Sequence, residues 1–221
     1  MILEQASYLD QQVTNELAAA VAVGEAGDVV FDALTLWVNP DGYVLPLGMT
    51  GSADTLGGGV LAITVDGWVV GGRRGKGLSI AAGRADVTAS GSFKVPGPEV
   101  TSFRSWVGAE LRRELREEAG AALGEVAALE LVAVYRDLYR GGKPEVLAVA
   151  RLDTRLSDLT AGDDMAELEP LGQVRKMADL ERLVRETCEL DDVPVSFRVL
   201  GEILSEEIEA PFGRSQLEKL F

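Results

Sequence analysis

The sequence predicts a mixed α/β fold, in which a mixed β-sheet carries helices on its faces. Two observations predict it: β-rich segments and helical periodicities occur in one chain, and they do not alternate as strict β-α-β units. The length of 221 residues suits one sizeable domain, or one domain with an extension. No shift in composition is strong enough to indicate two independent domains. We therefore expect residues 1–55 to form an N-terminal extension packed on a main domain of residues 56–221.

The N-terminal extension is predicted to contain a helix followed by a β-hairpin. Apolar residues at helical spacing predict the helix over about residues 8–23. Residues 29–38 are rich in β-forming side chains, a turn signal occupies residues 39–42, and a strand resumes at residues 43–45.

A second β-hairpin and a small-residue loop are predicted to open the main domain. Asp66-Gly67 lies between two β-branched runs, at residues 60–65 and 68–70, which is a strong signal for a hairpin. The following residues 78–98 are rich in Gly, Ser and Ala, and we expect a short strand near residues 93–95.

A helix is predicted to follow this loop. Thr101 or Ser102 can cap its start, and Gly120 is placed to end it in the left-handed conformation. Apolar residues recur at helical spacing along it, at Phe103, Trp106, Val107, Leu111 and Leu115.

The rest of the main domain is predicted to add strands and C-terminal helices. We expect strands at residues 129–135 and 146–152, an acidic irregular segment at 157–169, helices at 180–189 and 197–207, and a peripheral or partly mobile tail after residue 211.

The charge and the missing residue types exclude several classes of function. The formal net charge of −15 opposes general binding to nucleic acid or to an anionic membrane surface, both of which require basic side chains. The sequence has no histidine, which removes Ser-His triads and His-ligated zinc. Its one cysteine, Cys188, is expected to be buried filler. Since no signal peptide or membrane-spanning run is evident, we expect a cytoplasmic protein.

Three glutamates lie close together near the end of the predicted helix. Glu114, Glu117 and Glu118 are spaced at i, i+3 and i+4, which is predicted to place them on one side of the helix. The helix dipole is negative at this end, so we expect a positive group to compensate the carboxylates. Hard oxygen ligands of this kind suit Mg²⁺ or Mn²⁺. A solvated helix face with ordinary ion pairs, such as Arg113 with Glu117, is the alternative.

The segment of residues 113–121, Arg-Glu-Leu-Arg-Glu-Glu-Ala-Gly-Ala, resembles the second half of the Nudix signature, Arg-Glu-U-x-Glu-Glu-x-Gly-U, where U is a bulky aliphatic residue. Ala121 is the one soft mismatch. The context also agrees, because the match falls on a helix after a hairpin and a Gly-rich loop. The first half of the signature departs, since Ser105 stands at its Glu position and Glu99 at its Gly position.

The resemblance implies a Nudix-type α/β/α sandwich and a divalent-metal site for Mg²⁺ or Mn²⁺. It implies that Glu114, Glu117 and Glu118 are metal ligands and that Arg113 orients one of these carboxylates. The general base would be Glu117 or an acidic residue of the later loop, where Glu167 is the first candidate and Glu169, Asp163 and Asp164 are alternatives.

A basic stretch between residues 73 and 104 suits a phosphorylated ligand. We select Arg73, Arg74 and Lys94 as substrate-binding candidates; the alternative is that Arg73 and Arg74 protect the end of an edge strand. Residues 135–145 are similar to a segment of a Nudix subgroup associated with nucleoside-diphosphate sugars, and their aromatic side chains either stack on a base or pack in the core.

The function implied is hydrolysis of a diphosphate linkage in a nucleoside diphosphate joined to another moiety, such as a nucleotide sugar. The departure in the first half of the signature leaves a second hypothesis open, a non-catalytic Nudix-like module that binds or senses a nucleotide. We expect a small-molecule nucleoside-diphosphate partner, with no nucleic acid and no membrane. The resemblance also allows a homodimer to which the N-terminal extension would contribute.

Overall fold

The computed structural model describes three strands of the N-terminal region and most of the main domain. The described residues are 29–31, 34–38, 44–47, 56–77, 82–94, 103–137, 143–190, 193–205 and 217–221. The N-terminal strands are β1 (Val29–Phe31), β2 (Leu34–Val38) and β3 (Val44–Leu47), and they form a separate antiparallel sheet. The β-rich segment and its hairpin are therefore confirmed, whereas the helix expected over residues 8–23 lies outside the described residues.

The main domain contains a mixed sheet of seven strands. Its path is β10-β5-β4-β9-β8, with β6 paired to β5 and β7 paired to β4. The pairing of β4 with β9 is parallel and the others are antiparallel. The strands are β4 (Gly57–Ile63), β5 (Trp68–Arg74), β6 (Ala85–Val87), β7 (Ala89–Ser92), β8 (Val126–Asp137), β9 (Lys143–Leu152) and β10 (Met165–Gln173).

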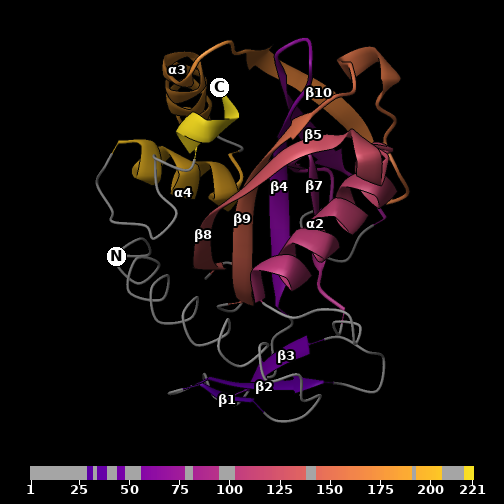
Figure 1. Ribbon diagram of the computed structural model, residues 1–221, viewed down its shortest axis with the longest axis vertical. Helices are drawn as coiled ribbons and strands as arrows, with labels where there is room; N and C mark the ends of the chain where they lie inside the picture. The colour runs from indigo at the N-terminus through magenta and orange to yellow at the C-terminus, as the bar shows by residue number, and fades with distance from the viewer. Residues whose placement is uncertain are drawn as a thin grey trace.

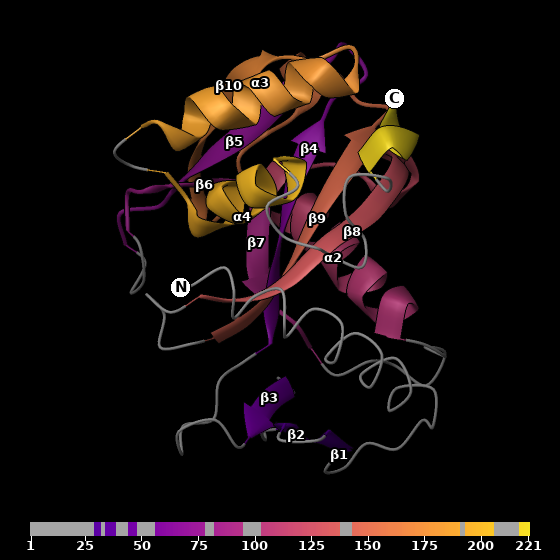
Figure 2. The same ribbon diagram turned by 90° about the vertical axis from the view of Figure 1, so that its left-hand side faces the viewer.

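Helices cover both faces of this sheet. The long helix α2 (Phe103–Ala119) lies on one face, and α3 (Met177–Cys188) and α4 (Val195–Leu204) lie on the other (Figures 1 and 2). Short 3₁₀ turns occur at Leu123–Glu125, Leu156–Asp158 and Glu218–Leu220. The predicted α/β/α sandwich with a mixed sheet is confirmed.

None of the helices in the described part of the chain is both long enough and apolar enough to cross a membrane.

The face under α2 has its own apolar core. Leu111 and Leu115 are fully buried against the sheet, as the helical spacing predicts. Phe93 and Trp106 pack edge to face with ring centroids 6.0 Å apart. The indole Nε1 of Trp106 donates a 2.8 Å hydrogen bond to the carbonyl oxygen of Lys94, which satisfies its buried polar atom. Burial of this stripe fixes which side of α2 faces the sheet.

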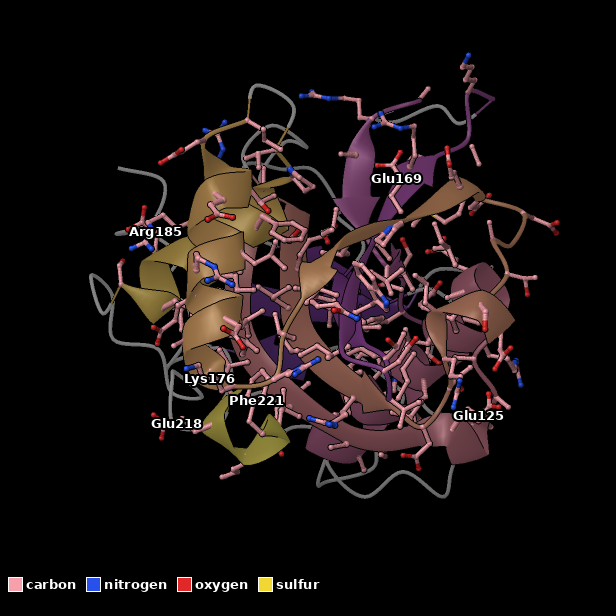
Figure 3. All side chains as sticks on the ribbon, turned by 90° about the horizontal axis from the view of Figure 1, so that it is seen from above. Glu125, Glu169, Lys176, Arg185, Glu218 and Phe221 are labelled. Carbon is pink, nitrogen blue, oxygen red and sulfur yellow. The ribbon has the colours of Figure 1, made fainter. Side chains whose placement is uncertain are left out.

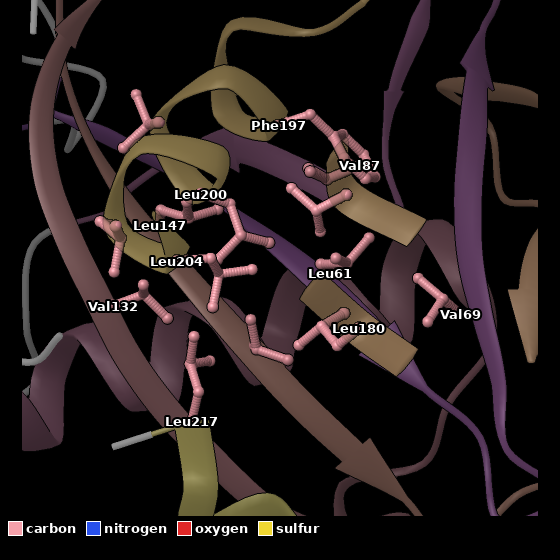
Figure 4. Packing of buried hydrophobic residues seen from close by; sticks show 14 of the residues in the cluster. Leu61, Val69, Val87, Val132, Leu147, Leu180, Phe197, Leu200, Leu204 and Leu217 are labelled. Atoms are coloured by element: carbon pink, nitrogen blue, oxygen red, sulfur yellow. The ribbon is translucent and has the colours of Figure 1, made fainter. Parts of the chain in front are cut away.

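A second apolar core fills the opposite face, between the sheet and α3 and α4 (Figure 4). Leu217 and Leu220 from the C-terminal end belong to this core and are buried. Arg151 of β9 also donates a 2.7 Å hydrogen bond to the carbonyl oxygen of Leu220. The expectation of a peripheral tail is therefore wrong for residues 217–221, because their leucines cover apolar surface on the sheet.

Two strands differ from the sequence-based expectation. The strand expected near residues 93–95 lies earlier in the chain, as β6 and β7, where small residues pair closely with β4 and β5. The segment expected to be irregular becomes β10 from Met165 onward, paired with β5 at the end of the sheet path. The exposed Glu167, the half-buried Glu169 and two register shifts hide the period-two pattern of β10.

Candidate functional site

The glutamates of α2 divide between two environments. Glu114 and Glu118 are 5% and 4% exposed, because they flank the buried stripe of Leu111 and Leu115 and point toward the sheet. Glu117 is exposed and its carboxylate pairs with arginines on the helix surface. The sequence predicts all three glutamates on one side of the helix. Glu114 and Glu118 do share the side that faces the sheet, whereas Glu117 points toward the solvent.

Strand β7 forms the floor beneath the two buried carboxylates. The backbone N–H of Ser90 donates a 2.6 Å hydrogen bond to Oε2 of Glu118. Gly91, the next residue, has no side chain, and an added Cβ there would overlap the carboxylate of Glu114. The small residues Ser90 and Gly91 therefore allow α2 to place the carboxylates of Glu114 and Glu118 directly against the backbone of β7.

Arg113 ties the helix carboxylates together. Its guanidinium donates to the carboxylates of Glu110 at 2.8 Å, Glu114 at 2.5 Å and Glu117 at 2.8 Å, and to the carbonyl oxygen of Ser92 at 3.1 Å. Burial works to lower the pKa of Arg113, but the hydrogen bond to Glu110 and the surrounding carboxylates raise it overall. The hydrogen bond to Glu114 is the contact that the orienting role implied by the resemblance would require.

The two buried carboxylates hold their protons more tightly than exposed glutamates do. Burial is the main cause that raises the pKa of Glu118 to about 8, against the hydrogen bond from Ser90 that lowers it. Burial is also the main cause that raises the pKa of Glu114, with Arg113 opposing. Two acids with raised pKa values at one place are typical of functional sites, and a cation beside them would favour their charged forms.

Glu114 and Glu118 supply two carboxylate ligands for a hard divalent cation, which is fewer than a complete metal site has. Among the described residues, no three Asp, Glu or Cys side chains are grouped closely enough to form a complete metal site. Mg²⁺, however, usually keeps several waters and takes one or two protein carboxylates, with substrate phosphates completing its shell. Glu114 and Glu118 match that requirement, and Glu117 would join them only after leaving Arg113 and Arg116.

Arg74, a substrate-binding candidate, lies on the α2 side of the sheet but is already engaged. Its Nη1 donates to Oδ2 of Asp86 at 2.9 Å and to Oγ of Ser90 at 3.0 Å. The Ser90 hydroxyl also donates to Asp86 at 3.0 Å. Asp86 and Ser90 were missed by the sequence reasoning, because their nearness to Glu118 arises from strand pairing between β5, β6, β4 and β7.

The alternative that Arg73 and Arg74 close an edge strand is wrong, because β5 lies between β10 and β4. Neighbouring strand residues point to opposite faces, so Arg73 is directed away from the α2 side. There its Nε forms a 2.8 Å ion pair with Glu169 of β10. Figure 3 labels Glu169 on this strand. Glu167 is directly opposite Arg73 in the ladder and therefore shares its face. The described structure does not bring Arg73 and Glu167 together with the glutamates of α2.

Lys94 is exposed at the end of the small-residue loop. Its backbone N–H donates a 2.8 Å hydrogen bond to Glu110, the same carboxylate that Arg113 contacts. The backbone of Lys94 thus contacts α2 at Glu110, one helical turn before Glu114.

The loop before β10 closes the end of α2. The backbone N–H groups of Thr160 and Gly162 donate to the carbonyl oxygens of Ala119 at 3.2 Å and Glu118 at 2.9 Å. The N–H of Gly75 donates at 2.9 Å to the carbonyl oxygen of Asp164 in the same loop. Asp163 and Asp164, both exposed, are thereby held near the glutamate end of the helix, whereas Glu167 lies further along β10.

No protein-family model matches the sequence, and no curated protein matches it. Solved structures with a similar arrangement exist. A MutT protein from Methanosarcina mazei is 16% identical, with 69% of this chain and 94% of that chain covered and a TM-score of 0.42. A Nudix hydrolase from Nitrosomonas europaea is 16% identical, with 80% and 90% covered and a TM-score of 0.45. A bifunctional NMN adenylyltransferase/ADP ribose pyrophosphatase from Francisella tularensis is 15% identical, with 72% and 43% covered and a TM-score of 0.49.

Proposed function

We propose that this protein is a Nudix-type, Mg²⁺- or Mn²⁺-dependent hydrolase that cleaves a diphosphate linkage. The observation that carries the proposal is the burial of Glu114 and Glu118 side by side against β7, on a helix whose sequence matches the second half of the Nudix signature. Burial without function is costly for two carboxylates, and a bound cation removes that cost.

Each residue of the site has a role in the proposed reaction. When bound, a divalent ion supplies positive charge to phosphate oxygens and lowers the pKa of a water molecule. Glu114 and Glu118 would hold this ion, and Arg113 fixes the orientation of Glu114 through their hydrogen bond. Glu117 is exposed at the same turn and would accept the proton of the attacking water. Asp163 and Asp164 are better placed than Glu167 as a second base, because their loop contacts the end of α2.

The proposed substrate is a nucleoside diphosphate linked to another moiety, such as a nucleotide sugar. The support is the signature resemblance and the similarity of residues 135–145 to a nucleotide-sugar subgroup. Lys94, whose backbone contacts Glu110 of α2, would bind a phosphate of this substrate. We also propose that residues 1–55 are an extension of the catalytic domain, and that this extension would form the contact in a homodimer. A cytoplasmic location is part of the same proposal.

A second candidate function, a non-catalytic nucleotide-binding module, is favoured by one observation. Glu117 is paired with Arg113 at 2.8 Å and with Arg116 at 3.4 Å, and no three acidic side chains of the described residues are grouped so that they could hold a metal ion. A protein of this kind would bind nucleoside diphosphates without turnover.

The two candidates are separated by a hydrolysis assay on the purified full chain. A panel of nucleotide sugars, dinucleoside polyphosphates and nucleoside triphosphates is incubated with Mg²⁺ or Mn²⁺, and with a chelator as the blank. We expect metal-dependent product release by the wild type, reduced at least about 100-fold in Glu118→Gln, which is the effect of losing a positioned catalytic group. Glu186→Gln on the exposed surface of α3 is the matched control and is expected to keep full activity. Tight binding of a nucleotide with no turnover of any compound would contradict the hydrolase proposal and support the non-catalytic binding module.

A further inference from the structure

Asp86 stands beside the candidate metal site in a role that nothing in the signature assigns. Both oxygens of its carboxylate accept hydrogen bonds: Oδ1 from the backbone N–H of Val87 at 2.8 Å, and Oδ2 from Arg74 and from the Ser90 hydroxyl. Its side chain is 17% exposed and that of Arg74 is 12% exposed, so the ion pair is largely removed from water. A pair of this kind is held much more firmly than one at the surface.

The positive charge of Arg74 works to lower the pKa of Glu118, against the larger effect of burial. Ser90 connects the two groups, since its backbone N–H binds Glu118 and its hydroxyl accepts from Arg74. The Nε of Arg74 is buried and has no hydrogen-bond partner among the described residues. A buried guanidinium with an unsatisfied donor is drawn to any carboxylate that it can reach.

Glu118 is a carboxylate that would satisfy this arginine. Within the described part of the chain it accepts one hydrogen bond, from Ser90, and forms no ion pair. A direct pair with Arg74 would neutralise Glu118 and occupy the oxygen that a cation needs. The arginine remains instead on Asp86, at 2.9 Å.

We propose that Asp86 is a positioning residue that retains Arg74 and so keeps Glu118 free to bind a divalent cation. This inference rests on the proposed function, because it assigns Glu118 to a cation. It also reassigns Arg74 from a substrate contact to a restrained partner of the site. Ser90 completes the arrangement, since its hydroxyl fixes the position at which Arg74 and Asp86 meet.

The test is a double-mutant cycle read by Mn²⁺ binding to the full chain, measured from the electron paramagnetic resonance signal of the free ion. In Asp86→Asn the arginine loses its charged partner and pairs with Glu118, so Mn²⁺ affinity is expected to fall about 10- to 100-fold, the range seen when outer-shell partners are lost. In the double variant Asp86→Asn, Arg74→Met the competing cation is gone, and affinity is expected to return to within about threefold of the wild type.

The matched control is Asp179→Asn on α3. Asp179 also accepts a backbone N–H, that of Arg175 at 3.0 Å, and pairs with an arginine, Arg182, at 3.7 Å, but it lies on the opposite face of the sheet. This variant is expected to bind Mn²⁺ as the wild type does. Thermal unfolding of each variant reports whether it is folded.

The outcomes separate the inference from the proposed function. If the wild type binds Mn²⁺ and Asp86→Asn binds equally well, the restraint is overturned while the metal site stands. If Asp86→Asn binds weakly and removal of Arg74 fails to restore affinity, Asp86 is only structural and the inference is again overturned. Absence of Mn²⁺ binding by the folded wild type overturns the proposed metal site and the inference with it.

Discussion

At the scale of single residues, the site depends on the absence of a side chain at Gly91. Because a Cβ at this position would overlap the carboxylate of Glu114, we expect Gly91→Ala to displace Glu114 from Arg113. Mn²⁺ affinity should fall about 10- to 100-fold, and the free energy of unfolding should decrease by about 1–3 kcal/mol from overpacking. Isothermal titration with Mn²⁺ and urea unfolding measure the two effects.

Gly77→Ala is the control for this substitution, because Gly77 is exposed and an added Cβ there meets nothing within 4 Å. It should leave both measurements unchanged. Equal behaviour of the two variants would mean that Glu114 is not held against β7.

The raised pKa of Glu118 predicts how stability depends on pH when no metal is present. The folded protein holds this proton up to about pH 8, whereas the unfolded chain releases it near the ordinary value of 4.5. Between these values the folded state binds more protons than the unfolded state, so stability must fall as pH rises through this window. Glu114 contributes in the same direction. We expect the melting temperature in chelator to drop by several degrees from pH 5 to pH 8.5, the window given by about 4.5 and about 8.

The variant Glu118→Gln cannot titrate at this position and should show a clearly smaller decline over the same pH range. Glu186→Gln should decline as the wild type does. A slope that is identical in the wild type and Glu118→Gln would show that burial does not hold the proton on this carboxylate.

At the scale of elements, α2 is closed at its C-terminal end by the loop before β10. The loop donates two backbone N–H groups to the last carbonyl oxygens of the helix, which otherwise lack partners. Gly162 is in such close contact with the backbone of Glu117 that an added Cβ would overlap its carbonyl oxygen. We expect Gly162→Ala to push the loop off the helix and to cost about 1–3 kcal/mol of unfolding free energy, measured by urea denaturation.

Gly124→Ala, in the 3₁₀ turn after α2, is the comparison, since an added Cβ there meets nothing within 4 Å. If Gly162→Ala is as stable as Gly124→Ala, the contact between the loop and the helix is not close. A loss of activity without a loss of stability would instead indicate that the loop acts through Asp163 and Asp164.

The sequence predicts an element well when a few neighbouring residues determine it, as turns and helix ends show. The Asp66-Gly67 turn joins β4 and β5 with Gly67 at φ 84°, and Gly120 ends α2 at φ 69°. Both positions require a conformation that glycine adopts easily. The sequence does not predict β10, because its acidic residues, Glu167 and Glu169, break the alternation on which strand prediction depends.

At the scale of the whole molecule, the candidate site combines residues that are distant in sequence. The motif on α2 identified Glu114, Glu118 and Arg113, since helical spacing and the signature are both local. Asp86 and Ser90 are near Glu118 only because β6 pairs with β5 and β7 pairs with β4. Such pairings depend on register across the sheet, which single-sequence patterns do not specify.

The sheet also determines where the side chains of the adjacent arginines, Arg73 and Arg74, point. The charge of Arg73 and Arg74 predicts a shared role, but strand alternation directs the two side chains to opposite faces, where they pair with Glu169 and Asp86. Once a strand is predicted through both residues, its period of two implies that their side chains point to opposite faces. Which of the two arginines faces the glutamates still depends on the face against which α2 packs.

The central claim is that the buried carboxylates of α2 bind a divalent cation, and the most direct test is Mn²⁺ binding by the full chain with Glu114 and Glu118 both replaced by glutamine. The free-ion resonance signal is titrated for the wild type, for this double variant and for Glu186→Gln. The account predicts saturable binding by the wild type and by Glu186→Gln, and loss of that binding in the double variant while thermal unfolding remains cooperative. Undiminished binding by the folded double variant would contradict it.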